Sequence, residues 1–146
     1  MKRARTVLGW NELVALPEWG ALLLPAKIDS GARSSSLHVE ELSVDGDRVT
    51  FTVPDAGHHP GHHAARIEAK VVRIARVTSS NGRAQKRIFV ETTLHLGPIL
   101  RKVEINLVSR GDMRFPMLIG RTALRRHFLV NPGRCHLASP PTLPEH

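Results

Sequence analysis

Hydrophobic and polar residues alternate along most of this chain in short runs separated by turn residues, a pattern that predicts β-strands. The segment from Ala21 to Ile28 is almost continuously apolar and is expected to form a buried strand. Residues 42–53 alternate on both sides of Asp45-Gly46, which predicts a hairpin. Residues 67–77 alternate loosely, and the change of face at Val71-Val72 predicts a bulged strand.

The second half of the chain continues this pattern. Asn81-Gly82 is a strong hairpin-turn signal, and strands are expected around it and at residues 88–94, 103–108 and 117–119. Only residues 121–128 suggest a helix, with Thr122 as a candidate cap. About six to eight strands and one short C-terminal helix predict an all-β fold, a small β-barrel.

Chain length and the C-terminal composition define the expected domain organisation. A chain of 146 residues is long enough for one domain with a substantial core. We assign residues 1–137 to that single domain. Three prolines lie between Ser139 and His146, so residues 138–146 are expected to form a disordered tail.

Charge and polar interruptions limit the possible environments and partners. The formal net charge of +8 predicts attraction to polyanions, but aromatic residues make up only 4% of the chain, few for a single-strand nucleic-acid binder. Polar residues break up the region after the basic N-terminus, and residues 21–26 are too short to span a bilayer. The single cysteine, Cys135, excludes an internal disulfide and is expected to be a semi-buried apolar residue. We therefore expect a cytoplasmic protein without a membrane partner.

The most informative chemical feature is Asp29-Ser30-Gly31, which directly follows the apolar run. A second informative segment, Leu118 to Arg121, lies much later in the chain. A carboxylate in such a turn can act as a general base on water if a second carboxyl group shares the work. The chain contains one such turn, so the second carboxyl group would have to come from another copy of the protein. Without this context, an Asp-Ser-Gly sequence is an ordinary turn or helix cap.

A histidine-rich segment is a candidate metal site. Four histidines lie between His58 and His63, and imidazoles bind zinc. Pro60-Gly61 interrupts the segment, and Asp55 is the one carboxylate nearby. The chain also lacks a His-Glu-x-x-His motif and a phosphate-binding Gly-x-x-x-x-Gly-Lys loop. We therefore expect no metal site and no cofactor.

Several long stretches of the chain resemble the retropepsin-like aspartic proteases, a family formerly called ATP-dependent zinc proteases. The matching stretches are Leu8-Gly9-Trp10, Leu16-Pro17-Glu18, Ala26 to His38, Ser80-Asn81-Gly82, Val90-Glu91-Thr92, Arg110 to Met113 and Pro116 to Arg121. The resemblance covers roughly residues 7 to 137. It implies a small closed acid-protease barrel that acts as a homodimer, with one catalytic aspartate in each subunit.

The resemblance also implies roles for particular residues. Asp29, Ser30 and Gly31 match the catalytic turn, although Ser30 stands where the family more often has threonine. Gly120 and Arg121 match a Gly-Arg pair that supports the site. Arg121 at the start of the expected helix would oppose the helix dipole, which suggests an acidic partner.

Two positions depart from the pattern. Arg33 stands where retroviral enzymes have an acidic residue, and Asn131-Pro132 replaces the usual Asp-Pro. The first departure changes the charge near the site, and the second removes the carboxylate of that turn.

A candidate flap follows from the same resemblance. The hairpin tipped by residues 79–82 precedes the strand leading to Leu118, as the flap does in retropepsins. Its basic arm contains Arg83, Lys86 and Arg87, which suit acidic side chains. The expected substrate-binding or flap residues are Ala32, Arg33, Ser80, Asn81, Gly82 and Arg87. Because family members often occur near ligases that add glutamates to proteins, acidic or glutamylated peptides are the expected substrates.

Three functions therefore remain open at the level of sequence. The first is a dimeric aspartic endopeptidase. The second is a peptide-binding barrel that kept the groove but lost turnover. The third is a basic β-barrel that binds RNA, for which a clustering of basic residues on one face would be the structural sign.

Overall fold

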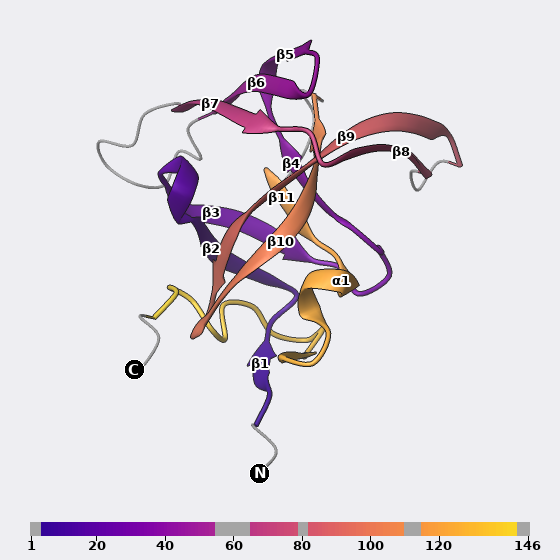
Figure 1. Ribbon diagram of the computed structural model, residues 1–146. Coiled ribbons are helices and arrows are strands. Elements are labelled where there is room, and N and C mark those ends of the chain that lie inside the picture. The colour runs from indigo at the N-terminus through magenta and orange to yellow at the C-terminus, as the bar shows by residue number, and fades with distance from the viewer. Residues whose placement is uncertain (1–3, 55–64, 79–81, 110–114, 143–146) are drawn as a thin grey trace.

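The computed structural model describes residues 4–54, 65–78, 82–109 and 115–142 (Figure 1). Within these ranges the chain forms twelve strands, a 3-10 helix and one short α-helix. The elements are β1 (Thr6–Leu8), β2 (Asn11–Leu16), η1 (Pro17–Trp19), β3 (Ala21–Ile28), β4 (Ser35–His38), β5 (Glu40–Asp45), β6 (Arg48–Val53), β7 (Ala65–Lys70), β8 (Arg73–Thr78), β9 (Ala84–Leu96), β10 (Ile99–Val108), β11 (Met117–Ile119), α1 (Arg121–Leu124) and β12 (Phe128–Val130). None of the described helices is long and apolar enough to cross a membrane.

Six strands form a nearly closed ring, which confirms the predicted all-β barrel. The ring runs β10-β4-β11-β3-β2-β9, and β9 pairs again with β10 to complete it. The closing contact between β2 and β9 is narrow, with Ala15 opposite His95. The first half of β9 extends beyond the ring and pairs with β8, so that these two strands project as a long hairpin (Figure 1).

Two smaller sheets accompany the barrel. Strands β5, β6 and β7 form an antiparallel sheet, and β1 pairs in parallel with β12 at the opposite end of the molecule (Figure 1). The three-stranded sheet is joined to the barrel by its own core residues. Phe51 of β6 is fully buried, and its ring contacts the edge of Trp19 in η1 at 5.2 Å between centroids. Burying two large aromatic side chains together stabilises this junction by the hydrophobic effect and by ring geometry.

The predicted strand 67–77 is interrupted at the expected bulge and becomes two strands in different sheets. β7 pairs with β6, whereas β8 pairs with β9. The amide of Val71 donates to Asp47, and the amide of the next residue, Val72, donates to Phe89. The single-strand prediction is therefore wrong at Val71-Val72, because the chain changes its hydrogen-bonding partner between these two residues.

Three other local predictions also need correction. The helix α1 covers only Arg121–Leu124 and begins at Gly120 without a side-chain cap, so Thr122 is not its cap. The chain then turns through Arg126, with φ of 74°, into β12. Cys135 is exposed rather than semi-buried, and it is a free thiol.

Strand β2 escaped the sequence analysis because it begins with two polar residues. Asn11 and Glu12 are buried, and the Glu12 side chain is inaccessible to solvent. The Glu12 carboxylate accepts hydrogen bonds from the amides of Gly9, Leu137 and Ala138, at 2.7, 2.9 and 3.0 Å. It also accepts one from the Ser139 hydroxyl. A buried carboxylate is tolerated because these donors replace its lost hydration.

The same contacts bear on the segment that was assigned to a tail. Residues 138 and 139 are tied to Glu12, and the amide of Thr142 donates to the carbonyl oxygen of Gly97 at 3.1 Å. Residues 138–142 therefore lie along the barrel, and residues 143–146 fall outside the described ranges.

Glu18 supplies a test of how η1 is attached to the barrel. Its carboxylate accepts hydrogen bonds from the Thr92 hydroxyl at 3.1 Å and the Thr93 amide at 3.2 Å, and these bonds lower the pKa of Glu18 below its ordinary value of 4.5. A lowered carboxyl pKa stabilises the fold above the unfolded-state pKa, and this contribution disappears as the pH falls through the folded-state pKa. We expect the free energy of unfolding of Glu18→Gln to fall less steeply than that of the wild-type protein as the pH decreases below about 5. Urea unfolding of both proteins across this range measures the effect, and parallel pH profiles would contradict it.

Candidate functional site

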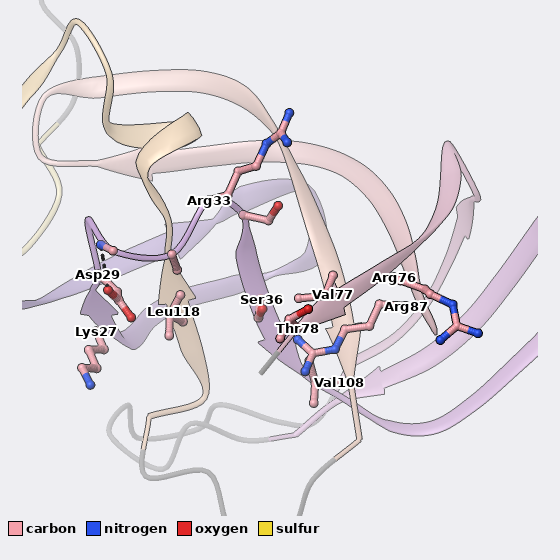
Figure 2. Close-up of a pocket in the computed structure, with 13 residues that line it drawn as sticks. Lys27, Asp29, Arg33, Ser36, Arg76, Val77, Thr78, Arg87, Val108 and Leu118 are labelled. Carbon is pink, nitrogen blue, oxygen red and sulfur yellow. Dashed lines mark hydrogen bonds between the residues drawn. The ribbon is translucent and has the colours of Figure 1, made fainter. Parts of the chain in front are cut away.

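The Asp29 turn is held where two parallel strands end together. β3 and β11 pair in parallel, with Ile28 opposite Ile119, and the Asp29 amide donates to the Ile119 carbonyl oxygen at 2.9 Å. The half-buried Asp29 carboxylate accepts a hydrogen bond from the Gly31 amide at 3.0 Å (Figure 2). The side chain is thus fixed at a strand end by its own turn, with its second oxygen available to the adjoining pocket.

The loop after Asp29 is bound to the start of α1. The Arg121 amide donates to the Ala32 carbonyl oxygen at 2.8 Å, and the Thr122 amide donates to that of Arg33 at 3.2 Å. The Arg121 guanidinium also donates to the Gly31 carbonyl oxygen, at 3.2 Å. Among the described residues, the partner of the Arg121 side chain is therefore a backbone carbonyl of the Asp29 turn, and not the acidic group that its position suggested.

Gly120 is required at the point where these segments cross. An added Cβ atom would lie 2.5 Å from the Ser34 carbonyl oxygen, which is closer than any van der Waals contact allows. The Gly120 amide donates to the buried Ser35 hydroxyl at 3.0 Å. Absence of a side chain and this one hydrogen bond together let the loop pass directly over the end of β11.

A cavity of about 520 Å³, which we call the Asp29 pocket, opens beside this turn. One wall is the loop carrying Asp29 and Ala32, and the opposite wall is the hairpin of β8 and β9 (Figure 2). The lining residues are Lys27, Asp29, Gly31, Ala32, Arg33, Ser34, Ser36, Arg76, Val77, Thr78, Arg87, Val108 and Leu118.

The predicted flap residues fall in different places. Arg87 lines the pocket, whereas Gly82 is exposed, with φ of +83°, and does not line it. Ser80 and Asn81 lie outside the described residues. Arg83 and Lys86 are exposed and do not line the pocket, so of the basic arm only Arg87 reaches it.

The pocket is strongly basic. Lys27, Arg33, Arg76 and Arg87 line it, and Asp29 is the one acidic residue among the described lining residues. Lys27 and Arg76 were not identified from the sequence. Arg76 could have been identified, because it lies on the strand that leads into the predicted flap hairpin.

A buried polar network connects the β8–β9 hairpin to the barrel wall. The Arg87 guanidinium donates to the Asn106 Oδ1 atom at 3.0 Å, and the Ser36 hydroxyl donates to the same oxygen at 3.0 Å. The Asn106 amide group donates in turn to the Ser35 carbonyl oxygen at 2.9 Å. Asn106 is fully buried and was also missed, because a polar residue between Ile105 and Leu107 in an alternating strand is expected to face solvent. The network fixes Arg87 against the pocket wall.

Other candidate residues lie away from the pocket. Ser30 is exposed and does not line the cavity. Asp55 and the histidines at 58, 59, 62 and 63 lie outside the described residues. Within the described ranges, no group of three His, Cys, Asp or Glu side chains is arranged to hold a metal ion.

Comparison with known proteins links this geometry to one family. The model of the family described as "Retropepsin-like aspartic endopeptidase RimB" matches residues 7–141. A solved structure of a Legionella pneumophila protein of unknown function is similar, with a TM-score of 0.73 and 26% identity, covering 91% of this chain and 98% of that one.

Curated relatives carry a different name. Proteins named "Probable alpha-L-glutamate ligase" are 33% identical in Shewanella pealeana and 30% identical in Desulfotalea psychrophila. The matches cover 91% and 89% of this chain but only 30% and 29% of those proteins. The chain therefore spans less than a third of the length of these relatives, which contain much that it does not.

The crossing at Gly120 can be tested by adding one methyl group. We expect Gly120→Ala to lower the free energy of unfolding by about 1–3 kcal/mol, because the new Cβ atom must displace the backbone of Ser34. Gly133→Ala is the matched control, since its added Cβ atom would meet its nearest atom at an ordinary 3.5 Å. Equal stability of the two variants in urea unfolding would show that the close approach is unimportant.

Proposed function

Because the chain belongs to the RimB-like family of retropepsin-like aspartic endopeptidases, we propose that it is an aspartic peptidase whose catalytic centre is completed by a second copy of the chain. The observation that carries this proposal is the position of Asp29. Its carboxylate is held at the end of β3 and faces a pocket closed on the other side by the β8–β9 hairpin.

One carboxyl group is insufficient for the reaction. Two carboxyl groups about 3 Å apart share a proton, so that one is ionised while the other is protonated. Among the described residues that line the pocket, Asp29 supplies the one carboxyl group. We therefore assign the second to Asp29 of a partner subunit, brought close by a two-fold axis.

The proposed reaction uses both protonation states. The ionised carboxylate takes a proton from water while the oxygen of that water attacks the scissile carbonyl carbon. The protonated carboxyl group gives its proton to the carbonyl oxygen. The resulting diol then gives one hydroxyl proton to the carboxylate that had protonated the carbonyl oxygen, while the carboxyl group that took the proton from water gives it to the amide nitrogen. The C–N bond breaks, a carboxylic acid and an amine are released, and the two carboxyl groups again share one proton. The hydrogen bond from Gly31 to Asp29 orients the carboxylate, and the hairpin would exclude water from the site.

The pocket chemistry supports acidic peptides as substrates. Four basic residues line the pocket, and guanidinium groups bind carboxylates through charge-assisted hydrogen bonds. The similarity to part of proteins named glutamate ligases supports substrates that carry added glutamates.

That similarity also favours a second candidate. If the matching part of those ligases holds the acidic peptide on which they act, this chain would be a peptide-binding barrel without turnover. The two functions make opposite predictions for the Asp29 carboxylate, which only the peptidase requires.

Asp29→Asn tests the catalytic role directly. We expect cleavage of a glutamate-rich peptide to fall by a factor of at least about 10³, because the amide cannot act as a base. Asp29 makes no buried ion pair among the described residues, so the circular dichroism spectrum and the mass of the assembled protein in solution should be unchanged. Cleavage by the variant at the wild-type rate would refute the proposal. Tight peptide binding by a wild-type protein that cleaves nothing would favour the binding barrel.

A mixing experiment tests whether the site is shared between subunits. An excess of the Asp29→Asn protein should lower the activity of a fixed amount of wild-type protein, since most wild-type chains would then sit in mixed dimers with one carboxyl group. Gly133→Ala protein, which keeps Asp29, is the control: added in the same excess, it should raise the total activity rather than lower it. Unchanged activity after exchange of subunits would show that each chain works alone.

A further inference from the structure

A second cavity, which we call the outer pocket, adjoins the Asp29 pocket. It has a volume of about 460 Å³. Its lining residues are Arg33, Ser34, Arg73, Glu91, Arg101, Lys102, Val103, Glu104, Thr122 and Ala123. Arg33 and Ser34 line both cavities, so the loop after Asp29 separates them and is shared by them.

The outer pocket has an excess of positive charge. Four of its lining residues are basic and two are acidic. Glu104 is already occupied, because it pairs with the Arg73 guanidinium at 2.8 Å. That guanidinium also lies 3.8 Å from the centre of the Phe89 ring, so Arg73 is part of the wall.

The remaining basic groups make no ion pair in the part of the chain that the structure describes, although the charge of Lys102 acts on the Glu18 carboxylate and helps to lower its pKa. The ion pairs found there include neither Arg33, Arg101 nor Lys102. Arg101 is half-buried, and its Nη1 atom donates to the Ala123 carbonyl oxygen at 3.5 Å, which leaves its other donors available. Arg33 and Lys102 are exposed. Such groups can pair with anions supplied from outside the chain.

We propose that the outer pocket is a second subsite, formed by Arg33, Arg101 and Lys102, that binds acidic side chains of the substrate distant from the bond that is cut. This inference rests on the proposed function only for its substrate class. Arg33 provides continuity, because an acidic chain leaving the Asp29 pocket past Arg33 enters the outer pocket directly. The enzyme then prefers long acidic tails over short ones.

An acidic peptide fits the outer pocket better than a nucleic acid does. No aromatic residue is among the described residues that line either pocket, so neither offers the stacking surface that unpaired bases use. The basic residues are also continuous with the Asp29 pocket rather than spread over a separate face. Carboxylates at regular intervals along an extended chain match this arrangement.

The subsite can be tested by binding without turnover. In the Asp29→Asn background, we measure fluorescence anisotropy of labelled peptides with short and long oligoglutamate tails. Arg101→Gln/Lys102→Gln should weaken binding of the long tail roughly tenfold, and of the short tail hardly at all. Lys70→Gln/Arg125→Gln is the matched control, because it removes the same charge from residues that line neither pocket. Lys102→Gln alone serves if the double variant is unstable.

Each outcome decides the matter. Equal loss for both tails, or the same loss in the control pair, would show a general charge effect and overturn the subsite. No loss for the long tail would also overturn it, as would binding of single-stranded RNA, but not oligoglutamate, through the same two residues. If the long tail binds as expected but the wild-type protein cleaves nothing, the proposed peptidase function fails and the subsite stands.

Discussion

The parallel pairing of β3 with β11 is the constraint on which the site depends. It joins two segments far apart in the chain and makes both end at the same level, with Ile28 beside Ile119. The carboxylate of Asp29 and the start of α1 therefore emerge together. Three backbone or side-chain bonds from residues 121 and 122 then hold the intervening loop. These bonds, together with the one that the Gly31 amide donates to the Asp29 carboxylate, restrict both the loop and the side chain.

The rest of the barrel serves to keep this crossing in place. β4 pairs with both β11 and β10, and the hydroxyl of Ser35, at the start of β4, accepts a hydrogen bond from the Gly120 amide. On the other flank of β3, the buried Glu12 carboxylate in β2 accepts hydrogen bonds from the Gly9 amide and from the Leu137 and Ala138 amides of the segment after β12. Buried polar groups of this kind are costly unless fully paired, so each favours one arrangement of the chain.

Basic residues of the chain are concentrated around the two pockets. The net charge of +8 could have been spread evenly, but seven basic residues gather around two adjoining pockets. The loop carrying Arg33 lies between these pockets, directly after the catalytic-type turn. The Asp29 pocket, with four basic residues and one carboxylate among its described lining residues, is therefore strongly positive.

The local pattern of the sequence determined most strands and the turn at Asp29, because alternation and turn residues act over a few positions. The link of that turn to Gly120-Arg121 was expected only from the family resemblance. It did not reveal the break at Val71-Val72 or the shortness of α1, since both depend on which distant strand supplies hydrogen bonds. Nor did it reveal β2, where three of the four donors to the buried Glu12 carboxylate come from the far end of the chain, at Leu137, Ala138 and Ser139. The two pockets likewise arise only in three dimensions. They unite Lys27, Arg76 and Arg101 from three strands, and no spacing along the chain encodes that proximity.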